Sequence, residues 1–239
     1  MQDLLIFHRN LRIEDNAALY NASLNQDYSS VFIFDKAYWS QSDRSVNQLK
    51  FALDSLNELE LELKKFNVNL YVFEGSLRDF ASYMNQNHPN SNLHMNHTTE
   101  TEYFSRNLKA LKQNFSLSVN EYKDFGIQIT NQNRDCWASD WQNYMKSETY
   151  KIPSVSKKFK TMNLPKFSEF KNYVNNYSAH IQKGGTISGK GLLTSFLEKR
   201  CKGYSKKMSN PSDAAISCSR LSPHIAFGTL SIRSIYQEL

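Results

Sequence analysis

Residues 4–19 read LLIFHRNLRIEDNAAL, in which a short apolar run is followed by polar residues and then by a helical pattern. The run from Leu4 to His8 is suited to a buried strand. Asp15 lies directly before the helical pattern, where a short polar side chain can act as an N-cap. The stretch therefore predicts a strand followed by a helix, which is the first unit of an α/β fold.

The same alternation continues through the first half of the chain. An apolar run at 31–34 predicts a second buried strand, and leucines at helical spacing predict a long amphipathic helix over 45–66. Residues 69–73 predict a third strand, and Ser76 can cap a helix that ends near Asn87. The remaining expected elements are a weaker strand at 92–95, a helix at 99–115 and a strand at 117–122.

Strands that alternate with helices at this spacing predict a parallel sheet with helices on both faces. Residues 1–127 are therefore expected to form one α/β, Rossmann-like domain. Ligands on such open sheets bind beyond the carboxyl ends of the strands. This directs attention to the loops that follow Phe7, Phe34, Phe73 and Met95.

The second half of the chain is organised differently. Residues 128–185 form a mixed segment with scattered prolines and lysines, which predicts an interdomain connection with one short helix at 140–146. Helical patterning returns at Thr186, is interrupted by a polar loop at 209–213, and continues to Leu239. Residues 186–239 are expected to be the first helices of an all-α domain.

The net charge also differs between the two halves of the chain. Residues 1–127 hold 12 Lys/Arg against 16 Asp/Glu, a net charge of −4, whereas residues 128–239 hold 17 against 7, a net charge of +10. A basic half favours a polyanionic partner such as DNA, because each neutralised phosphate releases counterions. A solvated, lysine-rich surface is the alternative explanation.

Several classes of protein are excluded or disfavoured. The chain has no apolar run long enough for a membrane helix, and its first residues lack the basic region of a secretory signal, so a cytoplasmic location is expected. Three scattered cysteines are too few for a disulfide framework, and no metal site is expected. Gly184, Gly189 and Lys190 have the spacing of a phosphate-binding P-loop, but Gly191 replaces the required Ser/Thr and no strand precedes it.

Two segments resemble the DNA photolyase and cryptochrome family. Residues 8–19 are similar to the family signature in which Arg-Asp-Leu-Arg precedes Asp-Asn, although Asn10 and Glu14 depart from it. Taken alone, these charges are more typical of a surface salt-bridge cluster. Residues 218–231, CSRLSPHIAFGTLS, resemble the family's Thr-Ser-Arg-Leu-Ser-Pro segment, and Tyr204 matches its upstream tyrosine. The cysteine that replaces threonine resembles the class III, plant-cryptochrome-like photolyases.

The resemblance implies that the helical domain binds FAD. Small hydroxyl residues at a helix N-terminus can donate hydrogen bonds to the phosphates of such a ligand. The chain would then end inside the flavin domain, with catalytic residues beyond position 239 and with Leu221, Ile225 and Ile235 lacking their partners. An antenna chromophore such as a folate (MTHF) would lie near the loop at 96–106. The residues implied at the flavin are Tyr204, Cys218, Ser219, Arg220, Leu221 and Ser222.

The implied activity is light-dependent repair of cyclobutane pyrimidine dimers in DNA. A monomeric deoxyribodipyrimidine photo-lyase would flip the dimer out of the base stack and split it with an electron from reduced FAD. Two alternatives remain open at this point. One is a cryptochrome, a blue-light photoreceptor with little or no repair, and the other is a fragment that binds no flavin.

Overall fold

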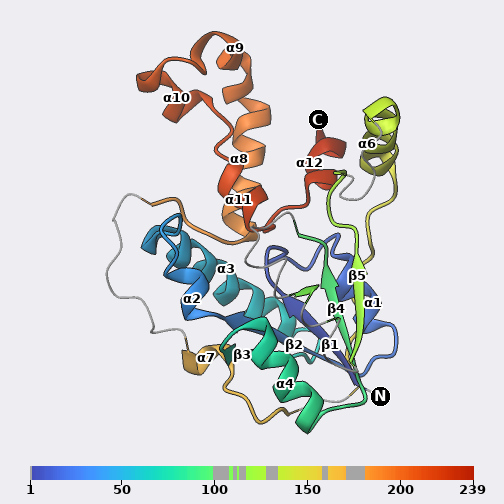
Figure 1. Ribbon diagram of the computed structural model, residues 1–239. Helices are drawn as coiled ribbons and strands as arrows, with labels where there is room; N and C mark the ends of the chain where they lie inside the picture. Colours follow the sequence, from blue (N-terminus) through green and yellow to red (C-terminus); the bar gives the residue numbers. More distant parts are fainter. Residues whose placement is uncertain are drawn as a thin grey trace.

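The computed structural model describes residues 2–98, 108, 109, 112, 117–127, 134–157, 161–170 and 181–239. Five parallel strands form one sheet in the order β3-β2-β1-β4-β5, and helices cover both faces (Figure 1). This confirms the predicted α/β fold. The strands are β1 (Gln2–Phe7), β2 (Tyr28–Phe34), β3 (Leu70–Glu74), β4 (Ser91–Asn96) and β5 (Ser118–Tyr122).

Alternate residues of β1, β2 and β3 enter two separate cores. Leu5 and Phe7 of β1 pack in the core that also contains residues of α1 (Ala17–Ser23) and α3 (Val46–Lys64). Leu4 and Ile6 pack in the second core, with residues of α4 (Leu77–Asn87). Because side chains alternate across a strand, the apolar run Leu4 to Phe7 of β1 is buried on both faces of the sheet.

Helix caps explain where these helices begin. Capping boxes join Ser45 to Gln48 at α3 and Ser76 to Asp79 at α4, as the sequence predicts for Ser76. The prediction that Asp15 caps α1 is wrong. Asn16 is the N-cap, and its side chain accepts a hydrogen bond from the backbone N–H of Leu19 at 3.2 Å.

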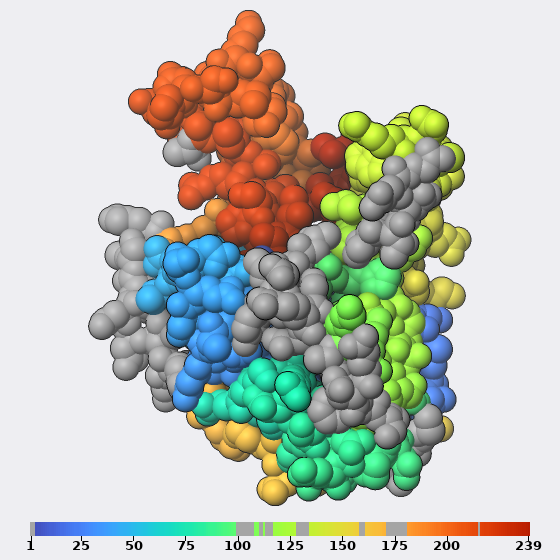
Figure 2. All heavy atoms as spheres, viewed as in Figure 1, coloured from blue at the N-terminus to red at the C-terminus, as the bar shows by residue number. Residues whose placement is uncertain are grey.

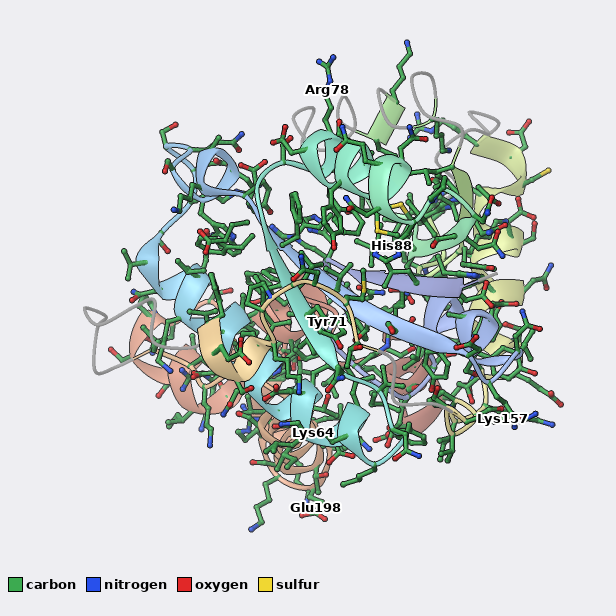
Figure 3. All side chains as sticks on the ribbon, turned by 90° about the horizontal axis from the view of Figure 1, so that it is seen from below. Lys64, Tyr71, Arg78, His88, Lys157 and Glu198 are labelled. Atoms are coloured by element: carbon green, nitrogen blue, oxygen red, sulfur yellow. The ribbon has the colours of Figure 1, made fainter. Side chains whose placement is uncertain are left out.

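The connection between the two halves packs along β3 at the edge of the sheet. Tyr71, which lies in the interior in Figure 3, accepts hydrogen bonds from the Asn69 amide and from the backbone N–H of Met162. The backbone N–H of Val72 donates to the carbonyl of Pro165 at 2.9 Å. This segment therefore covers an edge strand that would otherwise expose unpaired backbone groups. It includes α7 (Phe167–Phe170).

The C-terminal part is helical, as predicted, but it consists of more and shorter helices than expected. The polar loop at 209–213 contains the start of a helix, because Asn210 caps it and Pro211 fits its first turn. The stretch from 221 to 239 forms two helices separated by a turn in which Gly228 has φ +63°. The helix predicted at 99–115 falls almost entirely outside the described residues.

The helices of this part surround the carboxyl edge of the sheet. In Figure 1, α8 rises from the sheet and carries α9 and α10 at its far end, whereas α11 and α12 lie closer to the strands. Figure 2 shows α9 and α10 as a lobe that projects from the body. The elements are η1 (Arg134–Cys136), α6 (Trp137–Lys146), α8 (Thr186–Glu198), η2 (Arg200–Gly203), α9 (Tyr204–Lys207), α10 (Pro211–Ser217), α11 (Ser222–Ala226) and α12 (Ile232–Glu238).

Leu221 and Ile235 are not left without partners. They are 5% and 7% exposed, and they form a small core with Leu193 of α8 and Leu230. That part of the sequence expectation is wrong, because the turn at Gly228 folds α12 back toward α8. Ile225 is 42% exposed.

No helix among the described residues is both long and apolar enough to cross a membrane.

Candidate functional site

The loop after β1 is occupied by the chain's own C-terminal part. The backbone N–H of Leu11 donates to the carbonyl of Phe227 at 3.2 Å, and the Arg9 guanidinium donates to the carbonyl of Ala226 at 3.0 Å. The Arg12 guanidinium donates to the carbonyl of Gly228 at 3.1 Å. The 8–19 signature is therefore a docking surface for the α11–α12 segment, and not a surface salt-bridge cluster.

Two buried ion pairs lie at this docking surface, and one of them joins it to α12. Arg12 pairs with Asp124, and Arg233 of α12 pairs with Asp15, whose carboxylate also accepts from the Ser231 hydroxyl. Burial alone would raise the pKa of Asp15, but the hydrogen bonds from Arg233 and Ser231 outweigh it and hold this pKa below its usual value. Asp15 is thus an ionised partner of α12, which explains why it does not cap α1.

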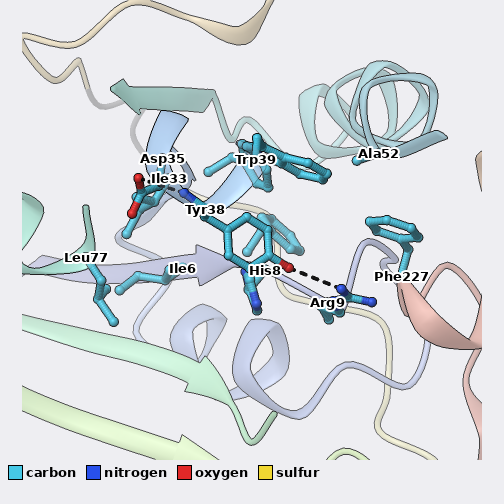
Figure 4. Close-up of a pocket in the computed structure, with 12 residues that line it drawn as sticks. Ile6, His8, Arg9, Ile33, Asp35, Tyr38, Trp39, Ala52, Leu77 and Phe227 are labelled. Atoms are coloured by element: carbon cyan, nitrogen blue, oxygen red, sulfur yellow. Dashed lines mark hydrogen bonds between the residues drawn. The ribbon is translucent and has the colours of Figure 1, made fainter. Parts of the chain in front are cut away.

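Two hollows lie beyond the carboxyl ends of the strands, where the α/β pattern directs the search. The smaller, at the ends of β1 and β2, has a volume of about 30 Å³ and is bordered by His8 and by the hydrogen-bonded pair Arg9 and Tyr38 (Figure 4). That volume accommodates only one or two water molecules.

The larger hollow has a volume of about 480 Å³, which is in the range of small-molecule sites. It lies beside β1 and β4, between which the strand order reverses, and such switch points are the usual ligand sites of open sheets. His97, Phe125, Trp141 and Arg9 are among the residues that border it. Its lining combines aromatic and aliphatic residues with the charged residues Arg9, Arg12 and Asp124, a mixture typical of sites for planar polar ligands.

The structure brings the residues implied at the flavin into one region of the C-terminal helices, between the end of α8 and the start of α11. The ring of Tyr204 meets the ring of Phe196 edge-on, with centroids 5.6 Å apart. The Arg200 guanidinium lies 5.8 Å from the same Phe196 ring and donates to the carbonyls of Cys218 and Ser219. Phe196 and Arg200 together therefore connect Tyr204 with the 218–222 turn.

The backbone of this turn has the conformation of an anion-binding nest. Arg220 has φ +60°, and Leu221 follows with φ −86° and ψ −9°. A left-handed residue next to a right-handed one turns successive backbone N–H groups to one side, where they can surround an anion. Ser222 begins α11 next to this turn.

The candidate residues do not all have the same environment. Cys218 and Ser219 are half-buried and Arg220 is exposed, so their polar groups are accessible to a ligand. The side chain of Leu221 is buried in the small core, which makes it an anchor of the turn. Sequence reasoning missed Arg200 and Gln182, whose amide donates to the carbonyl of Arg220 at 2.6 Å. No local pattern distinguishes Arg200 from its basic neighbours.

Comparison with known proteins establishes the family. A family model described as DNA photolyase matches residues 4–125, just over half of the chain. The chain therefore belongs to the DNA photolyase family, to which the cryptochromes are related. Within the curated relatives, the (6-4) DNA photolyase of Arabidopsis thaliana is 37% identical over 83 residues, which cover 30% of this chain and 15% of that protein. Cryptochrome-2 of Gallus gallus is 23% identical over 262 residues, covering 98% of this chain and 45% of that protein.

Solved structures show the same fold. A photolyase from Sulfolobus tokodaii, described with two FAD molecules, has a TM-score of 0.76 at 22% identity and is matched over 100% of this chain and 54% of its own. A class III photolyase from Agrobacterium tumefaciens has a TM-score of 0.75 at 20% identity, over 99% of this chain and 52% of its own. The chain thus spans about half the length of these proteins.

His224 is a buried histidine of α11. It is fully buried, its Nδ1 lies 2.8 Å from the Thr229 hydroxyl, and its ring packs edge-on against Phe51. Burial lowers the pKa of His224 to about 4, whereas an unfolded histidine titrates near 6.5. Between these values the unfolded chain binds a proton that the folded protein does not, so stability falls as the pH falls.

We expect the free energy of unfolding to drop by about 1 kcal/mol from His224 alone between about pH 7 and about pH 5.5, as measured by urea unfolding. The variant His224→Met removes the titrating group and should lose this part of the slope. An unchanged slope in the variant would contradict the assignment to His224.

Proposed function

We propose that the full-length protein is a deoxyribodipyrimidine photo-lyase, a flavoprotein that uses blue light to split cyclobutane pyrimidine dimers in DNA. The observation that carries this proposal is the conjunction of the family match over 4–125 with the anion-binding turn at 218–222. Two relatives described as photolyases share the fold over the whole of this chain or nearly so. The class III branch is part of the proposal, supported by Cys218 at the position where threonine is usual.

We propose FAD as the cofactor, and the residues present fit its phosphates. The backbone N–H groups of the turn and the hydroxyls of Ser219 and Ser222 would bind the phosphate oxygens. Lys206 and Lys207 add positive charge to the same lobe, in the last turn of α9. Tyr204 would lie beside the cofactor. When bound, FAD supplies the electron on illumination, and the protein holds and orients it.

Three further assignments belong to the same proposal. The α/β domain comprises 1–127, the connection 128–185, and the start of the FAD-binding domain 186–239. The protein acts as a cytoplasmic monomer. Its partner is DNA that contains pyrimidine dimers, which the charge of +10 on residues 128–239 would attract.

We also propose that an antenna chromophore such as a folate binds in the larger hollow at the β1–β4 switch point. His97 and Thr98, from the loop that resembles the family's antenna loop, border this hollow. Phe125 and Trp141 offer faces on which a planar ring can stack.

The test is repair of defined lesions by the purified, reduced full-length protein. Oligonucleotides that carry one cyclobutane dimer are expected to be restored in blue light and to remain unchanged in the dark. Oligonucleotides with a (6-4) photoproduct are expected to remain unrepaired. Repair of only the (6-4) lesion would contradict the lesion assignment. A flavin-containing protein that repairs neither would be a cryptochrome, the alternative that the likeness to cryptochrome-2 of Gallus gallus supports.

A further inference from the structure

We propose that Arg200 is a positioning residue that holds the 218–222 turn in its anion-binding conformation and thereby determines the preference for flavins that carry phosphate. This inference rests on the proposed function, because it assigns Arg200 a role at the proposed FAD site.

The Arg200 guanidinium is held by several acceptors at once. Its Nε donates to the Ser195 hydroxyl at 3.2 Å, and its Nη2 donates to the carbonyl of Leu192 at 2.6 Å. Both acceptors belong to α8, so the planar group is fixed on that helix. Its remaining donors reach the carbonyls of Cys218 and Ser219, the latter at 3.4 Å from Nη2.

These contacts determine which way the backbone N–H groups of the turn point. In a trans peptide the C=O and the following N–H point in opposite directions. When Arg200 binds the carbonyls of Cys218 and Ser219, it therefore directs the N–H groups of Ser219 and Arg220 away from α8. Gln182 has the same effect at the next peptide, because its amide binds the carbonyl of Arg220. Arg200 and Gln182 thus bind three consecutive carbonyls of the turn.

The turn needs this restraint. Arg220 has φ +60°, a left-handed conformation that is unfavourable for a residue with a Cβ. The side chain of Arg220 is exposed, so packing of that side chain does not hold it in place. The hydrogen bonds to the backbone carbonyls stabilise the strained conformation instead. Lysine could not replace Arg200, since one ammonium cannot reproduce a planar fork that spans two separate segments.

The experiment measures the affinities of the apo full-length protein for FAD and for riboflavin, which has the same ring system and no phosphate. In Arg200→Gln we expect FAD affinity to fall at least about tenfold, equivalent to about 1.4 kcal/mol, while riboflavin affinity stays unchanged. In Arg200→Lys we expect most of the same decrease in FAD affinity. Lys199→Gln removes one charge from the exposed neighbouring position and serves as the matched control, with FAD affinity expected to stay at the wild-type value.

The outcomes separate the possibilities. A parallel loss of FAD and riboflavin affinity would show that Arg200 only supports the fold of the lobe, and unchanged FAD affinity would show that the turn does not depend on it; either result overturns the inference. Full recovery in Arg200→Lys would overturn the claim that the fork geometry matters. A wild-type protein that binds neither flavin would instead refute the proposed function, and this inference with it.

Discussion

Replacing Gly228 by alanine is expected to destabilise the protein by about 3 kcal/mol or more, because the new methyl group has no room. A Cβ at this position would lie 2.0 Å from the backbone carbonyl oxygen of Arg9 and 2.8 Å from the Cα of Asn10. Both contacts are to backbone, which cannot move aside as a flexible side chain can. The φ of +63° adds strain for any residue with a Cβ. The measurement is the free energy of unfolding in urea.

Gly191→Ala is the matched control for this variant. Gly191 lies in α8, and a Cβ there would meet nothing within 4 Å. Alanine should stabilise the protein by up to about 1 kcal/mol, because it favours the helix over glycine. If Gly228→Ala were as stable as the wild type, the close docking of the α11–α12 segment on the loop after β1 would be incorrect.

Arg233→Met is expected to cost about 3–5 kcal/mol, since it leaves the carboxylate of Asp15 buried without its counter-ion. The Asp15 and Arg233 side chains are 2% and 5% exposed, so solvent cannot replace the lost interaction. The double variant Asp15→Asn/Arg233→Met should lose less stability than the two single changes added together, because the remaining group is then neutral. Urea unfolding of the four proteins measures this coupling.

The exposed pair of Lys65 and Glu62 provides the control for this ion pair. Their nitrogen and oxygen are 2.6 Å apart, but the side chains are 65% and 40% exposed. Lys65→Met should therefore change stability by less than about 1 kcal/mol. Equal effects of Arg233→Met and Lys65→Met would show that the pair at α12 is not buried in solution.

Much of the fold could be predicted because its signals are local. The apolar runs that form β1 and β2, and the leucine spacing of α3, need no information from elsewhere in the chain. Asp15 shows the limit of such reasoning. Its position before α1 is typical of an N-cap, but its partner Arg233 is 218 residues away, and nothing in the spacing of either residue indicates their contact.

Two adjacent glycines, Gly184 and Gly185, directly precede the first residue of α8. A Cβ at Gly184 would lie 2.2 Å from the carbonyl oxygen of Phe51, and Gly185 has φ +101°. The backbone N–H of Gly185 donates to the Ser55 hydroxyl at 3.0 Å. The glycines therefore allow α8 to approach α3 closely, which agrees with the rejection of a nucleotide-hydrolysing loop.

The candidate site could be predicted only in part. Residues 218–222 are found through a resemblance, because their order matches a known segment. Arg200 and Gln182 are not found, because they bind backbone carbonyls. Every residue has a backbone carbonyl, whatever its side chain, so the sequence does not mark the accepting residues. Contacts of this kind depend on where the chain passes, which the identity of the accepting residues does not reveal.

The measurement that tests the central claim most directly is the flavin content of the purified full-length protein, determined from its absorption spectrum and from the cofactor released by denaturation. We expect one FAD per chain, or uptake of one FAD when the colourless protein is titrated with the cofactor. A folded full-length protein that is colourless and takes up no FAD would contradict this claim.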